Sequence, residues 1–579
     1  MRLRLSLAAV AAVLVSAAPA AAAGDPIMPL SQVHSGMRCT GYSVVRGTTI
    51  SSFDVEVLDV VDGDPNENGP RILVQVSGPA VDGTGIGPGF SGSPIYCPGD
   101  DGVQRNIGAI SESIGEYGGR TVLATPIEAI LTNKPDAPHA GASAASAGPR
   151  RTQRVRRAER RLRRVGARSL TGPLTVSGLS APLGRALEAA GRRAGRPVLA
   201  APAGPLGSFP RQPLRPGSAV AVGYSSGDLR LGAIGTVAYT DDAAVWAFGH
   251  PFEAAGRRSL YLQDAYVFHV VNDPNAGDAT GGSYKLSAPG HDVGTLTNDA
   301  LDAVVGRVGA LPRSIPIRVR SHDDDTGRAG TVHVNAASET EVGDPTGFSP
   351  AGQVAPLAVL QGATQVLAAA PGRLSGRMCL RITLRERRTP ARFCNRYAST
   401  MSTGDAGGNG VALDAGLDVL DAFGLIDAYE GRPPHVTAVR ATVHARRGER
   451  LAALRSVRAP KVVRAGRRMR LRVRLQRVRG DAFTRTIRVR VPHGSAGRTM
   501  LTLRGADQPL GSADGFVELL IGDTQPRAPA TLDKLVAAID GIGRYDGVTA
   551  RLGHRSVRAF RDRDLLVTGR ARTHVRVRP

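Results

Sequence analysis

The sequence has few aromatic side chains and, after its first residues, no long apolar run. Aromatic residues make up 4% of the 579 residues, too few for the stacking platforms on which single-stranded nucleic acid is held. There is no Cys-x-x-Cys pair and the 12 histidines are scattered, so we expect no structural zinc site and no cofactor. No stretch after residue 23 is long and apolar enough to span a bilayer. We therefore expect neither a nucleic-acid partner nor a transmembrane segment in the mature chain.

The first 23 residues have the features of a secretory signal peptide. Arg2 and Arg4 precede a run of Leu, Ala and Val that ends in the small residues 21–23. No cysteine follows this site, so a lipoprotein anchor is not predicted. We expect the mature chain to be exported and released, that is, secreted or extracytoplasmic.

The charge balance is strongly basic. The formal net charge is +24 at pH 7 and is carried almost wholly by arginine. Such a balance bears on solubility and on contact with polyanions more than on fold. For an exported protein, the polyanions to expect are cell-wall polymers or anionic lipid headgroups.

Four cysteines fit an oxidising compartment. Cys39 and Cys97 fall in one segment near the amino terminus, whereas Cys379 and Cys394 flank a stretch with the pattern of a hairpin. We expect the disulfides Cys39–Cys97 and Cys379–Cys394, with the two other connectivities left open.

The most informative motif is the glycine-rich run 85–96, which contains a Gly-x-Ser-Gly-x-Pro core at Gly89, Ser91, Gly92 and Pro94. Glycines on both sides of the serine allow a tight turn that turns the hydroxyl outward and leaves main-chain N–H groups free to bind an oxyanion. Trypsin-like serine peptidases place their nucleophile in such a loop. A bare Gly-x-Ser-Gly is more often a β-turn in which the serine caps the backbone, so the surrounding sequence decides.

Abundant glycine and proline with little helical periodicity favour a mostly β protein of several domains. Strands are expected at 232–239 and 243–248, and alternating apolar and arginine residues predict further strands at 469–475 and 487–491. Helices are expected at 150–168, where the helix is short and basic, and at 412–429. The basic helix would pack a narrow stripe on a neighbour or dock on an anionic surface.

Several blocks around these motifs resemble the SpoIVB-type serine peptidases, peptidase family S55. The matching blocks span about residues 28–319 and are Gly41-Tyr42-Ser43-Val44-Val45-Arg46-Gly47-Thr48, Phe53-Asp54-Val55-Glu56-Val57-Leu58, the serine run, Ile107-Gly108-Ala109-Ile110, Thr125-Pro126-Ile127-Glu128, Ala247-Phe248-Gly249-His250-Pro251-Phe252, Lys285-Leu286-Ser287 and Gly294-Thr295-Leu296. The resemblance implies a trypsin-like double β-barrel in which Ser91 is the nucleophile and His250 the general base. Ser93 is the rival hydroxyl, and by the geometry of the loop the N–H groups of Gly89 and Ser91 would form the oxyanion hole.

The third member of the triad departs from the family pattern. In the sporulation peptidase that typifies the family, an aspartate lies shortly before the serine, and Gly78 stands at that place here. Asp54, Asp82 and Asp299 are the candidates, and we choose Asp299 because it lies in the histidine half. A triad without its carboxylate could persist as a slow dyad, since that group orients the histidine.

The order of the two halves also departs from the family, because the serine precedes the histidine. We therefore expect a rearranged double barrel followed by β-sandwich-like accessory domains. The expected segments are 1–23 signal peptide, 24–132 serine half, 133–168 linker and basic helix, 169–320 histidine half, 321–430 accessory β region with the disulfide hairpin and a helix, 431–525 β-sandwich-like domain, and 526–579 small C-terminal module.

The resemblance implies an exported serine endopeptidase that carries out limited proteolysis of another protein or of itself, with residues 150–168 as an exposed place for self-cleavage. The alternative is a non-catalytic protein that binds a cell-wall or surface polyanion and keeps the peptidase-like scaffold.

Overall fold

The protein is mostly β, with 53% of residues in strands and 15% in helices. The computed structural model describes residues 24–63, 69–115, 118–136, 167–170, 172–193, 198–201, 209–273, 282–339, 349–367, 373–399, 410–506, 529–542, 547–553, 555–562 and 564–579. The expected signal peptide and most of the expected basic helix lie outside these residues. The last residues of that expected helix, 167 and 168, belong instead to strand β7 (Ala167–Ser169), because they pair with the edge of β5.

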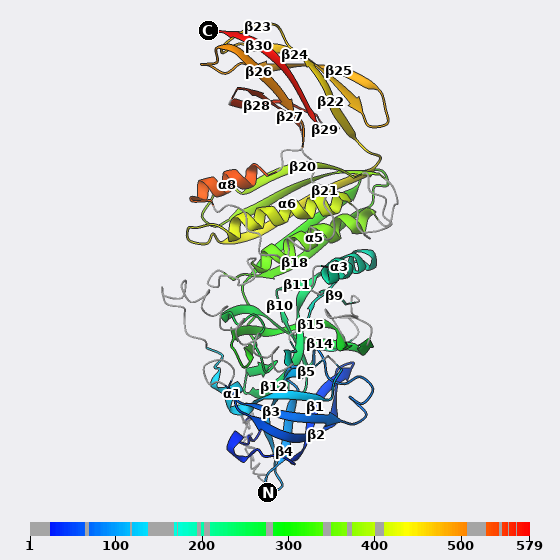
Figure 1. The fold of residues 1–579 in the computed structure, drawn as a ribbon, viewed down its shortest axis with the longest axis vertical. Helices are drawn as coiled ribbons and strands as arrows, with labels where there is room; N and C mark the ends of the chain where they lie inside the picture. Colours follow the sequence, from blue (N-terminus) through cyan, green and yellow to red (C-terminus); the bar gives the residue numbers. More distant parts are fainter. Residues whose placement is uncertain are drawn as a thin grey trace, which may run out of the picture.

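The first sheet closes into a six-stranded barrel at the amino-terminal end of the molecule (Figure 1). Its strands pair in the order β4-β1-β2-β3-β6-β5, and β5 returns to pair with β4. The strands are β1 (Arg38–Arg46), β2 (Thr49–Val61), β3 (Arg71–Ser77), β4 (Pro94–Pro98), β5 (Gln104–Ile114) and β6 (Thr121–Pro126), followed by helix α1 (Ile127–Thr132). Alternating side chains of β2, among them Val55 and Val57, fill the interior as a period of two requires. The serine run lies on the loop between β3 and β4.

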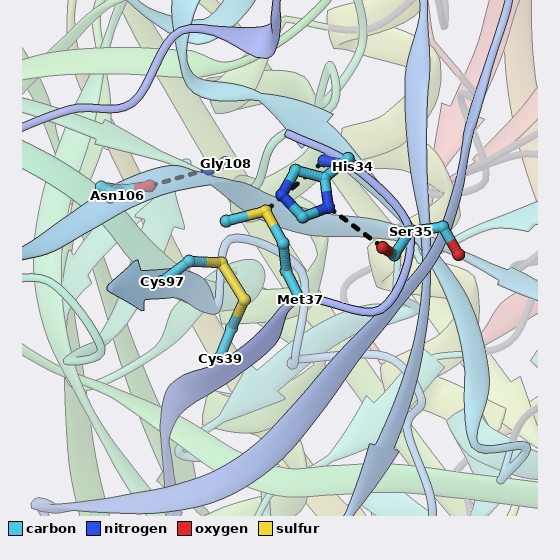
Figure 2. Close-up of a disulfide and its surroundings, with 7 residues drawn as sticks. All are labelled: His34, Ser35, Met37, Cys39, Cys97, Asn106 and Gly108. Atoms are coloured by element: carbon cyan, nitrogen blue, oxygen red, sulfur yellow. Dashed lines mark hydrogen bonds between the residues drawn. A yellow bond between two sulfur atoms is a disulfide. The ribbon is translucent and has the colours of Figure 1, made fainter. Parts of the chain in front are cut away.

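A disulfide fastens the strand that follows the serine loop. Cys97 on β4 is bonded to Cys39 on β1, as expected, and the bond spans 58 residues of sequence (Figure 2). Asn106 on β5 lies nearby, accepts a hydrogen bond from Gly108 N at 2.9 Å and donates one to the Ala238 carbonyl of the second sheet at 3.0 Å. The serine-bearing barrel is therefore fixed both internally and to its neighbour.

The second sheet curls so that β10 pairs with both β14 and β12. The ring runs β10-β14-β15-β16-β13-β12, and β8 and β9 extend it beyond β12. The elements are β8 (Leu174–Ser177), α3 (Ala181–Arg193), β9 (Val198–Ala200), β10 (Ala219–Gly223), β12 (Arg230–Asp241), β13 (Ala244–Ala247), β14 (Gly256–Asp273), β15 (Gly282–Asp299) and β16 (Val304–Val308). The two strands expected before the histidine are β12 and β13, which are antiparallel and joined at residues 242–243.

The segment that begins the described chain is held where the two sheets meet. The Tyr239 hydroxyl donates to the Asp25 carbonyl at 2.9 Å, and the Tyr96 hydroxyl donates to the Asp25 carboxylate. Met28 N donates to the Asn106 carbonyl at 2.9 Å. A short 3₁₀ turn, η1 (Leu30–Gln32), then leads into β1.

A third, six-stranded sheet occupies the middle of the molecule, with helices along one face (Figure 1). Its order is β11-β18-β17-β21-β19-β20, and α5 packs on β17, β18 and β21 while α6 packs on β19 and β20. The elements are β11 (Ser225–Gly227), β17 (Ser314–Asp323), β18 (Ala329–Ala337), α5 (Pro350–Leu367), β19 (Leu374–Leu384), β20 (Ala391–Ser399), α6 (Gly410–Asp427) and β21 (Val436–Arg447). β19 and β20 form the expected hairpin, which is closed by the expected disulfide Cys379–Cys394.

This sheet crosses the segment boundaries expected at 320 and 430. β17 straddles the first boundary, and β21, assigned to the sandwich-like domain, instead pairs in parallel with β17 at the centre of the sheet. Helix α5 was not expected, whereas α6 matches the helix expected at 412–429. Long-range pairing, which local pattern does not encode, sets these boundaries.

The carboxyl-terminal part consists of two sheets that share one apolar core. One sheet has the order β25-β24-β22-β29 and the other β23-β30-β26-β27-β28. The strands are β22 (Leu451–Arg458), β23 (Val462–Arg464), β24 (Arg468–Arg477), β25 (Ala482–Arg490), β26 (Gly497–Arg504), β27 (Gly547–Leu552), β28 (Arg555–Arg561), β29 (Leu566–Thr568) and β30 (Arg570–Arg578). The expected strands at 469–475 and 487–491 are β24 and β25, with buried apolar and exposed arginine side chains in alternation.

The described residues of the segment 526–579 do not form a separate module. β27 to β30 belong to the two sheets of the preceding domain, whereas α8 (Leu532–Asp540) packs on β20 and α6 of the central sheet. None of the helices in the described part of the chain is long and apolar enough to cross a membrane.

Candidate active site

The serine loop is a tight turn held by main-chain hydrogen bonds. Gly89 and Gly92 have φ values of +95° and +91°, a region that glycine enters without steric penalty. Ser93 N donates to the Phe90 carbonyl at 2.9 Å, and Gly92 N donates to the Ile110 carbonyl of β5 at 2.7 Å. These contacts fix the backbone on both sides of Ser91.

Two N–H groups of this loop have no acceptor among the described residues. Within the described part of the chain, neither Gly89 N nor Ser91 N donates a hydrogen bond. Buried main-chain donors are normally paired, so two open ones in a glycine turn are suited to receive a ligand oxygen. They are the amides that the sequence predicts for an oxyanion hole.

The histidine lies on a strained turn after β13. Phe248 has a φ of +69°, which is unfavourable for a bulky residue, and Gly249 follows at +68°. The Thr125 hydroxyl donates to the Gly249 carbonyl at 2.7 Å, and the rings of Phe248 and His250 lie 5.7 Å apart. His250 is therefore on the expected loop, and contacts from the first barrel hold that loop in place.

The serine and histidine loops contact each other through β12. Thr236 N donates to the Ser91 carbonyl at 2.7 Å, and Phe248 N donates to the Thr236 carbonyl at 3.2 Å. A Cβ atom at Gly92 would lie 1.9 Å from the Thr236 carbonyl oxygen and 2.6 Å from Phe248 N, so the approach requires glycine. The structure thus brings together two segments that lie far apart in the sequence.

Both candidate catalytic side chains are buried in this conformation. Ser91 is 1% exposed and His250 is 2% exposed. The Ser91 hydroxyl makes no hydrogen bond with any described residue. In this conformation neither side chain is accessible to a large ligand.

The surroundings of His250 make it a weak base. Burial lowers the pKa of the imidazole to about 4, and the positive charge of Arg71 acts in the same direction. The Nδ1 atom lies 2.8 Å from the Pro251 carbonyl oxygen, the position that a triad gives to its carboxylate. At neutral pH the ring is uncharged and has a carbonyl partner at Nδ1.

Asp299 holds the backbone that follows His250. Its carboxylate accepts hydrogen bonds from Phe252 N at 2.8 Å, Glu253 N at 2.7 Å and Ala255 N at 3.2 Å. Burial raises the pKa of Asp299, and Arg258, 3.8 Å away, opposes that shift. In this arrangement the carboxylate positions the histidine loop through its main chain.

The other two candidate carboxylates are exposed. Asp82 pairs with Arg120 at 3.4 Å on the surface. Asp54 lies on β2 beside Gly78, where a Cβ atom would be 3.5 Å from the Asp54 carboxylate.

Two buried polar clusters near the site were not predicted from the sequence. In the first, Arg71 pairs with Glu112 at 3.3 Å and with Asp302 at 3.4 Å, which links the first sheet to the second beside His250. Arg71 and Glu112 are close because β3 and β5 flank β6, and Asp302 comes from the turn between β15 and β16. No motif marks these residues in the sequence.

The second cluster is centred on Lys285 of β15. Its Nζ donates to the Ser43 hydroxyl at 2.7 Å and to the Thr236 hydroxyl at 3.2 Å, and lies 4.4 Å from the centre of the Phe90 ring. Lys285 N also donates to the Pro88 carbonyl at 2.9 Å. Burial lowers the pKa of Lys285 to about 7.

The rival hydroxyl, Ser93, is part of this cluster. Its hydroxyl donates a hydrogen bond to the Phe90 carbonyl at 2.6 Å and lies within hydrogen-bond distance, 2.9 Å, of the Ser43 hydroxyl. Its position is that of a structural group beneath the loop. The block Lys285-Leu286-Ser287 was the available sequence signal for this cluster.

Comparisons with known proteins add no further constraint on the site. No family model, no curated protein and no solved structure matches the chain.

Proposed function

We propose that the chain is an exported serine endopeptidase of the SpoIVB type, acting by limited proteolysis or self-cleavage. The observation that carries this proposal is the contact of the Ser91 loop with the Phe248–His250 loop through Thr236. The N–H groups of Gly89 and Ser91, which have no acceptor within the described residues, support it, because such groups can bind an oxyanion.

The proposed reaction follows acyl-enzyme chemistry. Ser91 Oγ attacks the scissile carbonyl while His250 accepts its proton, and the amides of Gly89 and Ser91 stabilise the oxyanion. His250 then protonates the leaving amine, and water hydrolyses the ester. Asp299 acts in this scheme by positioning the loop 252–255.

The two curled sheets are interpreted as the halves of a trypsin-like double barrel. Each contains a ring of six strands, closed by β4–β5 pairing in the first and by β10–β12 pairing in the second. The serine loop comes from the first ring and the histidine loop from the second, as in a site built between two barrels. The order of the halves is reversed relative to the family.

The burial of the site favours limited proteolysis over general digestion. A polypeptide can reach Ser91, 1% exposed, only after a covering segment moves. A base with a pKa of about 4 also gives slow proton transfer at neutral pH.

A fluorophosphonate probe tests the proposal, because it labels a serine only when its hydroxyl is activated. The wild-type mature protein is expected to be labelled, and Ser91→Ala and His250→Ala are expected to abolish labelling. Ser93→Ala is the matched control and is expected to keep it, since Ser93 lies beneath the loop. Folded wild-type protein that resists labelling, or labelling that persists in Ser91→Ala, would refute the assignment.

A second candidate function, binding of a polyanion, is favoured by a row of arginines on the central sheet. Arg318, Arg440, Arg381 and Arg392 are register neighbours on β17, β21, β19 and β20. Adjacent strands lie about 4.8 Å apart, and like charges placed side by side are destabilising unless a counter-charge is supplied. All four side chains are exposed, and none forms an ion pair with a described residue.

The binding function can be tested separately from proteolysis. Arg381→Ala with Arg440→Ala is expected to lower the salt concentration at which the protein elutes from a phosphorylated anionic resin. Arg470→Ala with Arg488→Ala, which removes the same charge from exposed neighbours on β24 and β25, is the matched control. If both double variants lower the elution salt concentration equally, retention depends on net charge alone and not on the arginine row.

A further inference from the structure

Two of the scattered histidines are direct neighbours in the central sheet. His322 of β17 and His444 of β21 are paired in the parallel register. Residues that are register neighbours on adjacent strands project from the same face of a sheet. Their rings lie 5.5 Å apart, on the face that carries the arginine row.

A carboxylate completes the group. Asp324 follows two residues after His322, and its N–H donates to the Ala445 carbonyl at 2.8 Å, which continues the pairing with β21. Its Oδ1 lies 2.9 Å from His322 Nδ1 and 3.0 Å from His444 Nδ1. The three ligand atoms all lie within 4.8 Å of one another.

The turn that carries Asp324 is anchored independently. Asp323 is buried, and its Oδ1 accepts hydrogen bonds from Asp325 N at 2.9 Å and Thr326 N at 3.4 Å. Arg447 lies 3.5 Å from Asp323 and 3.8 Å from Asp325, so its charge is already matched. Asp324 is therefore held in place without using its own carboxylate for the turn.

We propose that His322, Asp324 and His444 form a binding site for a divalent transition-metal ion on the central sheet. The ion would take the place of the hydrogen bonds between the two imidazoles and the carboxylate. Tetrahedral bonds of about 2.0–2.1 Å to nitrogen and oxygen place ligand atoms roughly 3.3 Å apart, close to the two Nδ1–Oδ1 distances. The fourth position faces solvent and would be taken by water.

The donor set selects the class of ion. Two imidazole nitrogens and one carboxylate suit Zn²⁺, Co²⁺, Ni²⁺ or Cu²⁺, whereas Ca²⁺ and Mg²⁺ prefer oxygen alone. Because β17 and β21 come from distant parts of the chain, an ion here would cross-link the turn after the barrel region to the strand that leads into the carboxyl-terminal sheets.

The test is isothermal titration of the untagged mature protein with Zn²⁺ and, separately, with Mg²⁺. One Zn²⁺ ion is expected to bind per chain, and titration with Mg²⁺ is expected to give no heat of binding. His444→Ala and Asp324→Asn are each expected to weaken this binding by about tenfold or more. His333→Ala is the matched control, because His333 is an exposed histidine on neighbouring β18 outside the group, and it is expected to bind as wild type.

A second readout identifies the coordination. Co²⁺ bound by the wild-type chain is expected to give visible absorption bands of a tetrahedral site, which His322→Ala abolishes. Absent Zn²⁺ binding by the folded wild-type protein, or binding that His444→Ala and His333→Ala reduce equally, would overturn the proposal. Neither result depends on peptidase activity.

Discussion

Replacing the buried Lys285 by methionine is expected to remove a distinct pH dependence of stability. The groups that face its ammonium in the described part of the chain are the hydroxyls of Ser43 and Thr236 and the ring of Phe90, none of them negatively charged. Methionine has a similar length and no charge. Ser43 keeps its bond to Ser93 and Thr236 keeps its bond to the Gly89 carbonyl, so the substitution leaves both hydroxyls paired.

The lowered pKa of Lys285 determines whether stability rises or falls with pH. The pKa of Lys285 is about 7 in the folded protein, below its ordinary value of 10.5. Between these two values the unfolded chain binds the proton and the folded chain does not, so stability rises with pH. The gain between pH 7 and 9.5 is about 3 kcal/mol, because each unit of pH contributes about 1.4 kcal/mol where the two states differ by a full proton.

Urea unfolding, monitored by tryptophan fluorescence, measures the free energy of unfolding of the second sheet, to which Lys285 belongs. The chain has a single tryptophan, Trp246, which is 5% exposed on β13 of the second ring. Wild type should gain about 3 kcal/mol over this range, whereas Lys285→Met should be nearly flat. Lys461→Met, at an exposed lysine, should behave as wild type. An equal rise in wild type and Lys285→Met would refute the reasoning.

Three further outcomes are expected. Joint replacement of Cys39 and Cys97 by alanine should lower the free energy of unfolding by about 4 kcal/mol, because the unfolded chain is no longer restricted by a closed loop of 58 residues. An unchanged urea midpoint would contradict this. Gly92→Ala should abolish fluorophosphonate labelling and lower the melting temperature, because its Cβ would meet a carbonyl oxygen at 1.9 Å, whereas Gly102→Ala, with open space around it, should retain labelling. Labelling should persist as the pH falls to 5 and disappear near pH 4, where His250 gains its proton, and a midpoint near the ordinary histidine value would argue against the buried environment.

Local patterns predicted the features that depend on neighbouring residues. The alternation of arginine with apolar residues located β24 and β25, and the hairpin pattern located the Cys379–Cys394 disulfide. The glycine run and the Ala-Phe-Gly-His-Pro-Phe block located the two loops that meet at Thr236.

Features that depend on long-range packing were not predicted. Helix α5 is buried on nearly all sides, so it lacks the amphipathic stripe by which a helix is recognised, and it contains Pro356, which ordinarily interrupts a helix. Lys285 and Arg71 are single residues within strands, and their roles arise only from the groups that the first two sheets place around them. The parallel pairing of β17 with β21 could not be read from either strand alone.

The anchoring of Asp25 between the first and second sheets bears on how the protein can be engineered. A Cβ atom at Gly24 would lie 2.2 Å from the Tyr239 hydroxyl, so a substitution at this glycine would disturb that contact. β30 pairs with β26 as far as Val577 and with β23 as far as Arg578, so an insertion within this strand would break that pairing. The turn between β24 and β25, around the exposed Arg479, is a more suitable place to insert a tag, because exposed loop tips tolerate insertions.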